Sequence, residues 1–456
     1  MSPSPARREL RTLILLSAPI ALTQLASMAM GAVDVLMLGN YSKQALAAGS
    51  LGRVWVMGTQ LAAQGVLFGI DPLIAQAHGA RDERAAGLAF QRGLILAVAV
   101  TLPLILSWTF TAEILALANI DPELADLAET YAFGRAPGVL FFLLFMVQRS
   151  WLQGRRILAP ALIIVIAANV LNWFADLALI HGKGPFPELG VLGAGLATSA
   201  TQVFLFGGLA LFIVRFRLDR GGWTGWSREA WDRKAMGRVL RIGVPIALLL
   251  GLEIWAFQIA TLMSGNLGET EVAAHAVVMT LASLSFMVPL GIGMGSQTRV
   301  GNLLGAGDQH RAELAARVAL RAGGVVMLGF ALTFILGADV LPPIFSDDVS
   351  VVAYAAIALP IAGLFQLFDG VQVIAACTLR GAGRTRAPLW FNLIGYYAIG
   401  LPLAYWWAFE RGWGFPGVWF GLAAGLGVIA PLLVVYVARV FRVAEDGAPG
   451  SGLQRL

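Results

Sequence analysis

The sequence is poor in charged residues and nearly free of cysteine. Only 13% of its 456 residues are Asp, Glu, Lys or Arg, whereas 58% are hydrophobic. Soluble globular domains carry about 25% charged residues, so this chain has too few to cover the surface of a soluble fold. Its single cysteine, Cys377, excludes a disulfide within the chain.

The sequence also lacks the phosphate-binding pattern G-x-x-x-x-G-K-[ST]. This absence argues against nucleotide hydrolysis by the chain, and we expect no enzymatic activity and no cofactor. Energy for any transport must then come from an ion gradient or from a solute's own gradient. The net charge of +5 is explained by membrane topology and contact with anionic lipid, so we expect no nucleic-acid partner.

Apolar runs long enough to cross a bilayer as a helix recur along the whole chain. Breaks at charged and Gly/Pro-rich positions divide it into twelve predicted spans: residues 12–38, 45–78, 86–113, 126–148, 157–181, 191–217, 237–264, 271–304, 311–340, 350–377, 386–408 and 415–442. The termini and the even-numbered loops carry 27 of the 32 Lys and Arg residues. The positive-inside rule places both termini in the cytoplasm. We therefore expect a multi-pass protein of the plasma (inner) membrane.

The chain contains an internal repeat, in a register that aligns Pro19 with Pro245. Over residues 19–82, 15 of 64 positions are identical to their aligned positions, including "PIAL" at 19–22 and 245–248. Chance would supply roughly five identities in such a window. Gly65 and Gly69 pair with Gly291 and Gly295 in this register.

The repeat predicts an all-α membrane protein of two six-helix lobes. Because six is even, the second lobe starts on the same side of the membrane, so the lobes are parallel and related by a pseudo-two-fold axis along the membrane normal. We assign residues 1–217 and 237–456 to the lobes and residues 218–236 to a cytoplasmic amphipathic linker. Two such lobes favour alternating access, and nothing in the sequence demands more than a monomer.

Few acidic residues lie deep inside the predicted spans. They are Asp34, Asp71, Asp176, Glu253 and Asp369. An ionisable residue at such depth is a functional candidate, with a structural hydrogen bond or a helix-locking pair as the alternative. Asp71 precedes Pro72, so a kink with a capping aspartate explains it as well as a functional site does.

Polar residues accompany these acids at helical spacing. In the fifth span Asn169, Asn172 and Asp176 follow an i, i+3, i+7 pattern, and Thr198 is available from the sixth span. In the second lobe Gln366 lies one turn before Asp369. The predicted supporting polar network consists of Asn169, Asn172, Thr198, Gln366 and Asp71. The predicted cation- or proton-coupling residues are Asp34, Asp176, Glu253 and Asp369.

A buried carboxylate can exchange a proton with either side of the membrane, because removal from water disfavours its charged form. Two carboxylates with further oxygens can instead hold Na⁺, and Glu253 with Asp369 is the place where this is possible. Either acid site can also neutralise an organic cation. Competition between ion and substrate for one site is the physical basis of antiport.

Several segments resemble the multidrug and toxic compound extrusion (MATE) family. The first lobe contributes "VDVLMLGN", "GIDPLIAQAHGA" and "NVLNWFADLALIHG", and the second contributes "GLEIWAF", "FDGVQVIAACTLRGAGRTRAP" and the most specific segment, "VAAHAVVMTLASLSFMVPLGIGMGSQTRVGNLLGAGD". The similarity covers roughly residues 12–440. It implies efflux of lipophilic organic cations in exchange for H⁺ or Na⁺.

The resemblance also implies roles for residues in both lobes. Asp34 is similar to the family's first-helix aspartate, and Asn172, Asp176 and Thr198 are similar to the polar network of members that couple to protons in the first lobe.

In the second lobe, Glu253 and Asp369 resemble the acids of the NorM-like and eukaryotic-type branches, and in the first lobe Asp71 resembles an aspartate of the eukaryotic-type pattern. Because both lobes keep their acids, H⁺ and Na⁺ both remain open. We expect H⁺, since one carboxylate suffices to bind it.

Three classes of function can be compared with this pattern. A cation-coupled multidrug antiporter agrees best with the acidic spans. A flippase for lipid-linked oligosaccharide or lipid, from the same superfamily, would favour a basic cavity for a diphosphate, whereas the deep charges here are mostly acidic. A passive channel or receptor would not need a two-fold repeat around acidic stripes.

Overall fold

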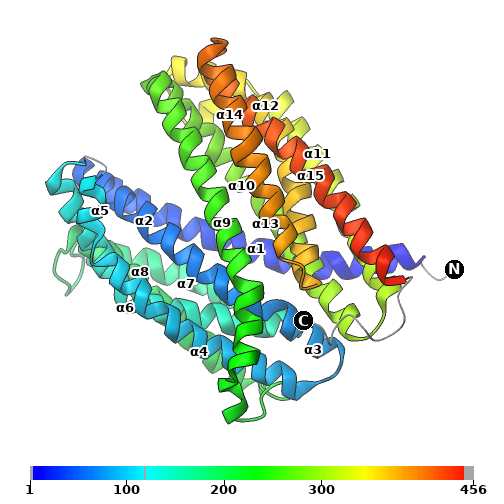
Figure 1. Ribbon diagram of the computed structural model, residues 1–456. Helices are drawn as coiled ribbons and strands as arrows, with labels where there is room; N and C mark the ends of the chain where they lie inside the picture. The colour runs from blue at the N-terminus through cyan, green and yellow to red at the C-terminus, as the bar shows by residue number, and fades with distance from the viewer. Residues whose placement is uncertain (1–3, 118–119, 446–456) are drawn as a thin grey trace. The chain divides into compact units, whose positions relative to one another are not determined.

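The computed structural model describes residues 4–117 and 120–445 (Figure 1). Within this part of the chain every regular element is helical and no strand occurs. Ten of the described helices are long and apolar enough to span a membrane: α1 (Pro5–Tyr41), α4 (Glu83–Trp108), α6 (Pro122–Gly154), α7 (Ala159–Leu179), α8 (Gly190–Arg215), α9 (Arg233–Leu267), α10 (Glu269–Gly305), α11 (Gln309–Leu336), α12 (Val349–Gly381) and α15 (Phe415–Glu445). The predicted cytoplasmic termini include residues 1–3 and 446–456, which lie outside the described residues.

The second and eleventh predicted spans are built from several shorter helical pieces. The second consists of α2 (Lys43–Leu67), the 3₁₀ turn η1 (Phe68–Ile70) and α3 (Asp71–Gly79). The eleventh consists of α13 (Arg386–Asn392), η4 (Leu393–Gly400), α14 (Leu401–Tyr405) and η5 (Trp406–Glu410). Both η4 and η5 are π-helical, a conformation that is rare and often found at functional sites. The remaining short elements are α5 (Thr111–Leu117), η2 (Arg228–Trp231) and η3 (Pro342–Ile344).

Two pairs of helices begin at positions that are aligned by the register of the internal repeat. The register aligns the first residue of α2 with that of α10, and the first residue of α4 with that of α11. The aspartates that end the repeated "GARD" and "GAGD" segments are N-caps: Asp82 accepts a hydrogen bond from the backbone N–H of Ala85 at 2.9 Å, and Asp308 accepts one from that of Arg311 at 3.0 Å. The repeat thus reproduces helix boundaries through the same capping chemistry.

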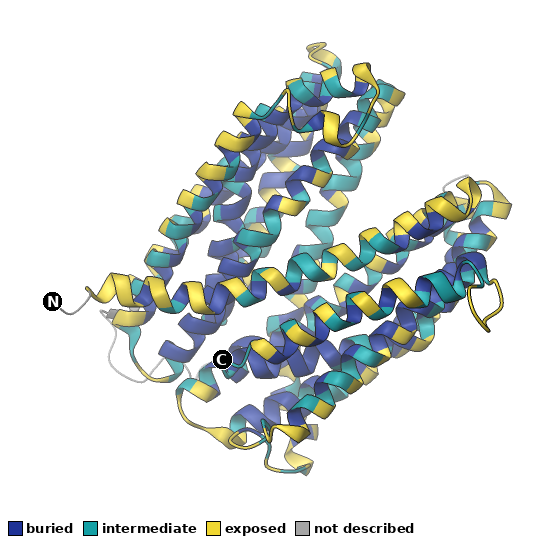
Figure 2. Ribbon diagram, turned by 180° about the vertical axis from the view of Figure 1, so that it is seen from behind, coloured by how far each residue is buried: buried dark blue, intermediate teal, exposed yellow. Residues whose placement is uncertain are grey.

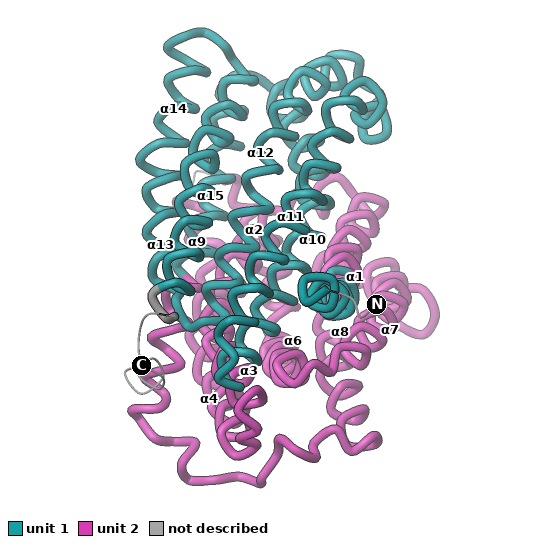
Figure 3. Tube along the Cα trace, turned by 90° about the vertical axis from the view of Figure 1, so that its right-hand side faces the viewer, with its two compact units in different colours: residues 1–21, 248–456 teal, residues 22–247 magenta. Residues whose placement is uncertain are grey.

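The chain divides into two compact units (Figure 3). Unit 1 contains residues 1–21 and 248–456, and unit 2 contains residues 22–247. These units differ from the predicted lobes at two places, because the first part of α1 belongs to unit 1, and both the linker and the first part of α9 belong to unit 2. The lobes as moving bodies stay a prediction.

Repeated glycines explain why α1 starts in unit 1. A Cβ atom on Gly291 of α10 would contact Ala21 of α1, and one on Gly295 would contact Ser17. Only glycine lets the two helix backbones approach so closely. Leu13 of α1 also packs with Ile292 in a small core of unit 1.

The matching glycines do the same for α9 in unit 2. A Cβ atom on Gly65 would contact the backbone of Ala247, and one on Gly69 would contact the carbonyl oxygen of Val239. Ala247 and Ala21 are aligned by the repeat register, so the close helix contacts are themselves repeated.

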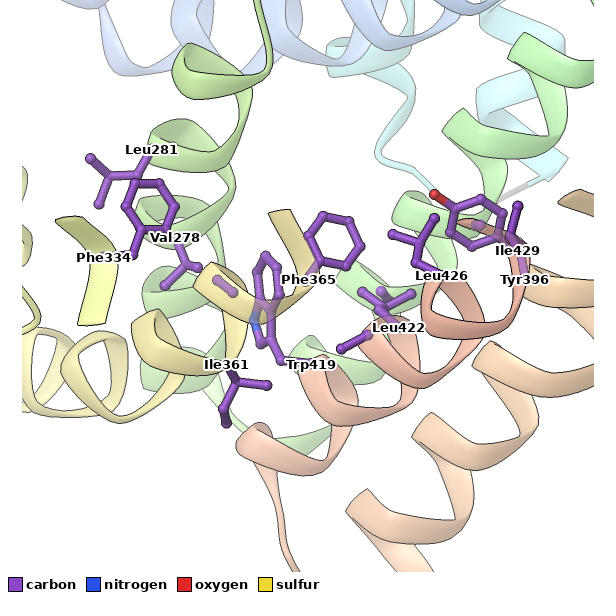
Figure 4. Packing of buried hydrophobic residues seen from close by; sticks show 14 of the residues in the cluster. Val278, Leu281, Phe334, Ile361, Phe365, Tyr396, Trp419, Leu422, Leu426 and Ile429 are labelled. Carbon is purple, nitrogen blue, oxygen red and sulfur yellow. The ribbon is translucent and has the colours of Figure 1, made fainter. Parts of the chain in front are cut away.

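Each unit has its own apolar core. In unit 1 the core includes Phe365 and Trp419, whose ring centroids lie 5.7 Å apart, together with Leu422, Leu426 and Ile429 of α15 (Figure 4). In unit 2 a second core centres on buried residues of α4 and α6 such as Trp108 and Leu143. Exposed positions are distributed along the helices (Figure 2), and many of them are large apolar residues, as expected for helices that face lipid.

Candidate functional sites

Unit 2 brings two predicted acids together. Asp34 comes from α1 and Asp176 from α7, and their side chains are 4% and 0% exposed. The two carboxyl groups interact through charge and lie within range of a side-chain hydrogen bond once one of them carries a proton. The hydroxyl group of Thr198, on α8, lies 3.1 Å from Asp34 Oδ2. Residues from three helices thus form one acidic site.

Local packing holds these side chains in place. Asn172 and Asp176 are four residues apart and therefore share one face of α7. Gly193 at the start of α8 lies against the backbone of Leu179 at the end of α7, which keeps the two helices close near Thr198. The Thr198 hydroxyl also lies 3.0 Å from the carbonyl oxygen of Ala194, so it can donate its single hydrogen to only one of its two neighbours at a time.

The acidic site of unit 2 is short of hydrogen-bond donors. Among the described residues no partner reaches Asp34 Oδ1, either oxygen of Asp176, or the amide nitrogen and oxygen of Asn172, and all of these atoms are buried. Buried polar atoms normally have partners, and two adjacent buried carboxylates are strongly disfavoured when both are charged. A proton shared by the pair, or a cation bound to it, would satisfy these oxygens.

Two other predicted residues of unit 2 have partners elsewhere. Asn169 donates a hydrogen bond to the carbonyl oxygen of Val165, one turn earlier on the same helix, at 2.9 Å. Asp71 begins α3 and interacts electrostatically with Arg149 of α6. Neither contact involves Asp34 or Asp176, and the supporting roles of Asn169 and Asp71 stay predictions.

Unit 1 holds the second acidic site around Glu253 of α9. Its Oε1 atom accepts hydrogen bonds from the side-chain amides of Gln372 and Asn392, each at 2.8 Å. The Gln372 amide nitrogen also lies 3.1 Å from Asn392 Oδ1. Helices α9, α12 and α13 therefore meet at one carboxylate that is supplied with two N–H donors.

Asp369 lies close to this carboxylate. It is 7% exposed, precedes Gln372 by one turn of α12, and interacts with Glu253 through charge. The phenol of Tyr396, in the π-helical segment η4, is buried near both acids, and its hydroxyl group has no partner among the described residues. Asp369, Glu253 and Tyr396 thus form a compact polar group in an apolar environment.

Two further side chains fix the surrounding helices. Gln366, predicted to support Asp369, donates through its amide nitrogen to the carbonyl oxygen of Ala282 on α10 at 2.9 Å. Tyr397 donates to the carbonyl oxygen of Leu252, next to Glu253, at 3.0 Å. Gln366 therefore ties α12 to α10.

The two sites differ in what they can bind. At Glu253 the groups that face the carboxylate are amide N–H donors, which stabilise an anion, while the oxygens of the same amides are possible ligands of a hard cation. At Asp34 and Asp176 acceptors predominate. Within the described residues no group of three or more His, Cys, Asp or Glu side chains could hold a metal ion.

Gln372, Asn392 and Tyr396 were not predicted as site residues. Gln372 follows Asp369 by three residues, so the helical spacing used for Gln366 would also have identified it. Asn392 and Tyr396 are four residues apart in the eleventh span, where their polar groups interrupt an apolar run. Neutral amides and phenols are common in such spans, which makes the signal weak.

One family model matches the chain twice. The model is MatE, and it covers residues 19–177 and 245–406. The two matches begin at positions that the repeat register aligns, which confirms the internal repeat.

Known proteins are similar over nearly the full length. A probable multidrug resistance protein NorM from Mesorhizobium japonicum is 35% identical, with 97% of each chain covered. Multidrug and toxin extrusion protein 2 from Mus musculus is 31% identical over 98% of this chain and 78% of its own length. The crystal structure of AtDTX14, a eukaryotic MATE transporter, matches with a TM-score of 0.89 at 24% identity, covering 97% of this chain and 99% of that one. The all-α, multi-pass membrane fold is thereby confirmed.

Proposed function

The chain belongs to the MatE family, and from this premise we propose that it is a secondary active transporter that exports lipophilic organic cations in exchange for protons. The names of its relatives, a multidrug resistance protein and a multidrug and toxin extrusion protein, support multidrug efflux. The positive-inside pattern supports a location in the inner membrane with both termini in the cytoplasm.

One observation carries the choice of coupling ion. Both carboxylate oxygens of Asp176 are buried without a donor among the described residues, and Asp34 lies beside them. A single proton between the two carboxyls supplies the missing donor and removes the repulsion between like charges. Neither effect needs the additional oxygen ligands that Na⁺ requires.

Antiport follows from competition for this pair. When the proton leaves, the Asp34–Asp176 pair gains a negative charge in an apolar environment, and an organic cation can neutralise it. The protonated pair has less negative charge to offer such a cation. Proton and substrate therefore exclude each other, and the two loaded forms can cross the membrane in opposite directions by alternating access.

The site at Glu253 and Asp369 is a second place for a cation. Two amide donors partly offset the cost of burying a charge on Glu253, and Asp369 lies close to it, so a bound cation would neutralise negative charge at this site. Because amide N–H groups face the carboxylate, we favour an organic cation here over Na⁺.

Transport by purified protein in proteoliposomes tests the proposal. Efflux of a fluorescent lipophilic cation is measured under an imposed pH gradient and, separately, under an imposed Na⁺ gradient. We expect the pH gradient alone to drive efflux, and we expect Asp34→Asn and Asp176→Asn to abolish it. Glu253→Gln and Asp369→Asn are expected to weaken binding of the cation.

Other outcomes would redirect the proposal. Efflux driven only by Na⁺ would make Glu253 and Asp369 candidate ion ligands and would contradict proton coupling. Full activity in both Asp34→Asn and Asp176→Asn would exclude the pair as the coupling site. If neither gradient moves the cation, transport of a lipid or lipid-linked oligosaccharide becomes the leading interpretation.

A further inference from the structure

The segment between α8 and α9, residues 216–232, is an ordered strap on unit 2. The side chain of Gln91, a fully buried residue of α4, donates to the carbonyl oxygen of Gly225 at 2.6 Å and accepts from the backbone N–H of Ser227 at 3.1 Å. Arg155 donates to the carbonyl oxygens of Leu218 and Arg220 at 2.6 and 2.5 Å. Side chains of unit 2 thus hold the strap backbone along most of its length.

Aromatic contacts continue from the core of unit 2 into the strap. The Phe90 ring stacks on buried Trp151 at 4.6 Å and meets the Trp223 ring of the strap edge-on at 5.8 Å. Trp223 in turn contacts Trp226 at 5.5 Å. A series of ring contacts therefore links Trp226 to Trp151 in the core of unit 2.

The outer surface of the strap is nevertheless apolar. Trp226 is 66% exposed, Trp231 is 67% exposed and Phe216 is 58% exposed. Three large aromatic residues on one short, ordered segment exceed what scattered surface residues explain. Their backbone is already fixed, so little further ordering is needed when they are covered.

The strap lies between cationic flanks: residues 216–232 carry three basic and three acidic residues, and the flanks within residues 215–241 add five further basic residues and no acidic one. Between residues 215 and 241 there are eight basic and three acidic residues, a net charge of +5, which equals that of the whole chain. Every one of the eight is exposed: Arg215, Arg217, Arg220, Arg228, Arg233, Lys234, Arg238 and Arg241. Of the acids, Glu229 is paired with Arg84 at 2.5 Å. The net charge on this surface is therefore positive.

The strap also begins and ends at helix faces that suit lipid. Leu211 and Val214, at the end of α8, are 69% and 70% exposed. Leu240 and Val244, near the start of α9, are 36% and 42% exposed. A segment that joins the ends of two lipid-facing helix surfaces lies at the height of the membrane interface, where tryptophan is favoured.

We propose that this strap is a membrane-docking surface for anionic phospholipid headgroups. Trp226 and Trp231 enter the headgroup region, and the surrounding arginines bind the lipid phosphates. Apolar burial and charge attraction act together in this mode of binding. The proposal concerns the lipid partner of unit 2 and does not depend on the transported substrate or the coupling ion.

Spin labels on the strap test it. Native Cys377 is buried and is replaced by Ser, and single cysteines are introduced as Trp226→Cys and Trp231→Cys in the full chain. Each labelled protein is reconstituted in phosphatidylcholine vesicles with and without phosphatidylglycerol. When phosphatidylglycerol is present, we expect both labels to be accessible to oxygen and shielded from a water-soluble relaxation agent. In phosphatidylcholine alone, we expect both labels to be less shielded from the water-soluble agent.

Charge variants provide the matched comparison in the same labelled proteins. Arg217→Gln with Arg228→Gln removes two exposed strap cations, while Lys183→Gln with Arg411→Gln removes two cations from loops predicted on the other side of the membrane. At about 1 kcal/mol per basic residue, the first pair should lower the docked-to-undocked ratio roughly 30-fold, and the second should leave it unchanged. All of these side chains are exposed, so we expect the variants to fold.

Two results would overturn the proposal. Labels at residues 226 and 231 that stay open to the water-soluble agent in both lipid mixtures would show that the strap faces the cytosol. Equal shielding in the strap variant and in the control variant would show that its cations bind no anionic lipid.

Discussion

Replacing Asp176 with asparagine should abolish transport and leave the stability of the protein at neutral pH nearly unchanged. The two buried oxygens of Asp176 have no donor within the described part of the chain, and the neighbouring Asp34 Oδ1 is also without one. An asparagine at this position keeps the shape and adds an N–H₂ group that can donate to Asp34. A hydrogen bond to a charged group contributes about 2 kcal/mol to stability.

The size of the competing effect can be estimated from charge alone. Two unit charges about 4 Å apart repel each other by about 4 kcal/mol at an effective dielectric constant near 20. The shared proton that we propose removes this repulsion and also supplies a hydrogen bond between the two carboxyl groups, so the wild-type pair already has the donor that an asparagine would add. Asp176→Asn is then expected to change the free energy of unfolding by less than about 1 kcal/mol, because the amide N–H takes the place of the shared proton as the donor to Asp34.

Thermal unfolding of the detergent-solubilised protein at neutral pH measures this difference. Asp126→Asn is the control, because Asp126 is an exposed aspartate of α6 and its replacement should change stability by less than about 0.5 kcal/mol. A loss of stability beyond this range would mean that the carboxylate has a favourable ionic partner, and a gain of several kcal/mol would mean that both carboxyl groups are charged in the wild type. The interpretation of the pair as a proton site would then be wrong.

Two further comparisons of unfolding temperature test the packing. Glu9 is 3% exposed and accepts two hydrogen bonds from Arg299 at 2.7 and 2.8 Å, so Glu9→Gln should lower the free energy of unfolding by about 3 kcal/mol. Arg311 is a second, half-exposed partner of Glu9, so Arg311→Gln should lower it by less than about 1 kcal/mol. Gly69→Ala places a methyl group against the backbone of α9 and should cost about 1–3 kcal/mol, whereas Gly58→Ala meets no atom within 4 Å and should be neutral or stabilising. Equal effects within either pair would contradict the contacts on which these values rest.

Hydropathy and the repeat predicted much of the fold. Spans could be located because an apolar run of sufficient length has few alternatives to a membrane helix. The repeat register also paired Gly65 with Gly291 and Gly69 with Gly295, which prove to occupy equivalent helix crossings. It did not reveal that α1 and α9 each begin in the unit opposite to the lobe predicted for them. The unit in which each helix begins depends on which helix backbone packs against Gly65 and Gly69 and which against Gly291 and Gly295. The periodicity of residues within one helix carries no information about such a partner.

The acidic sites were only partly predictable. Buried acids stand out in apolar spans, but Asp34 and Asp176 belong to helices far apart in the sequence, and only the folded chain brings them together. The burial of Glu9 was not predicted, because Glu9 lies in an arginine-rich segment whose composition is typical of an exposed chain terminus. In the structure Glu9 is buried and forms ion pairs with Arg299 and Arg311. Gln372 was missed because a neutral amide attracts less attention than a charge.

Proton release on substrate binding is the most direct test of competition at the Asp34–Asp176 pair. Tetraphenylphosphonium, a lipophilic cation, is added to the purified protein in weakly buffered detergent solution, and the released protons are counted with a pH indicator. We predict release of about one proton per cation bound by the wild type, as linkage between the two ligands requires, and none by Asp176→Asn. Binding without proton release in the wild type, or the same release from Asp176→Asn, would contradict exchange at this pair.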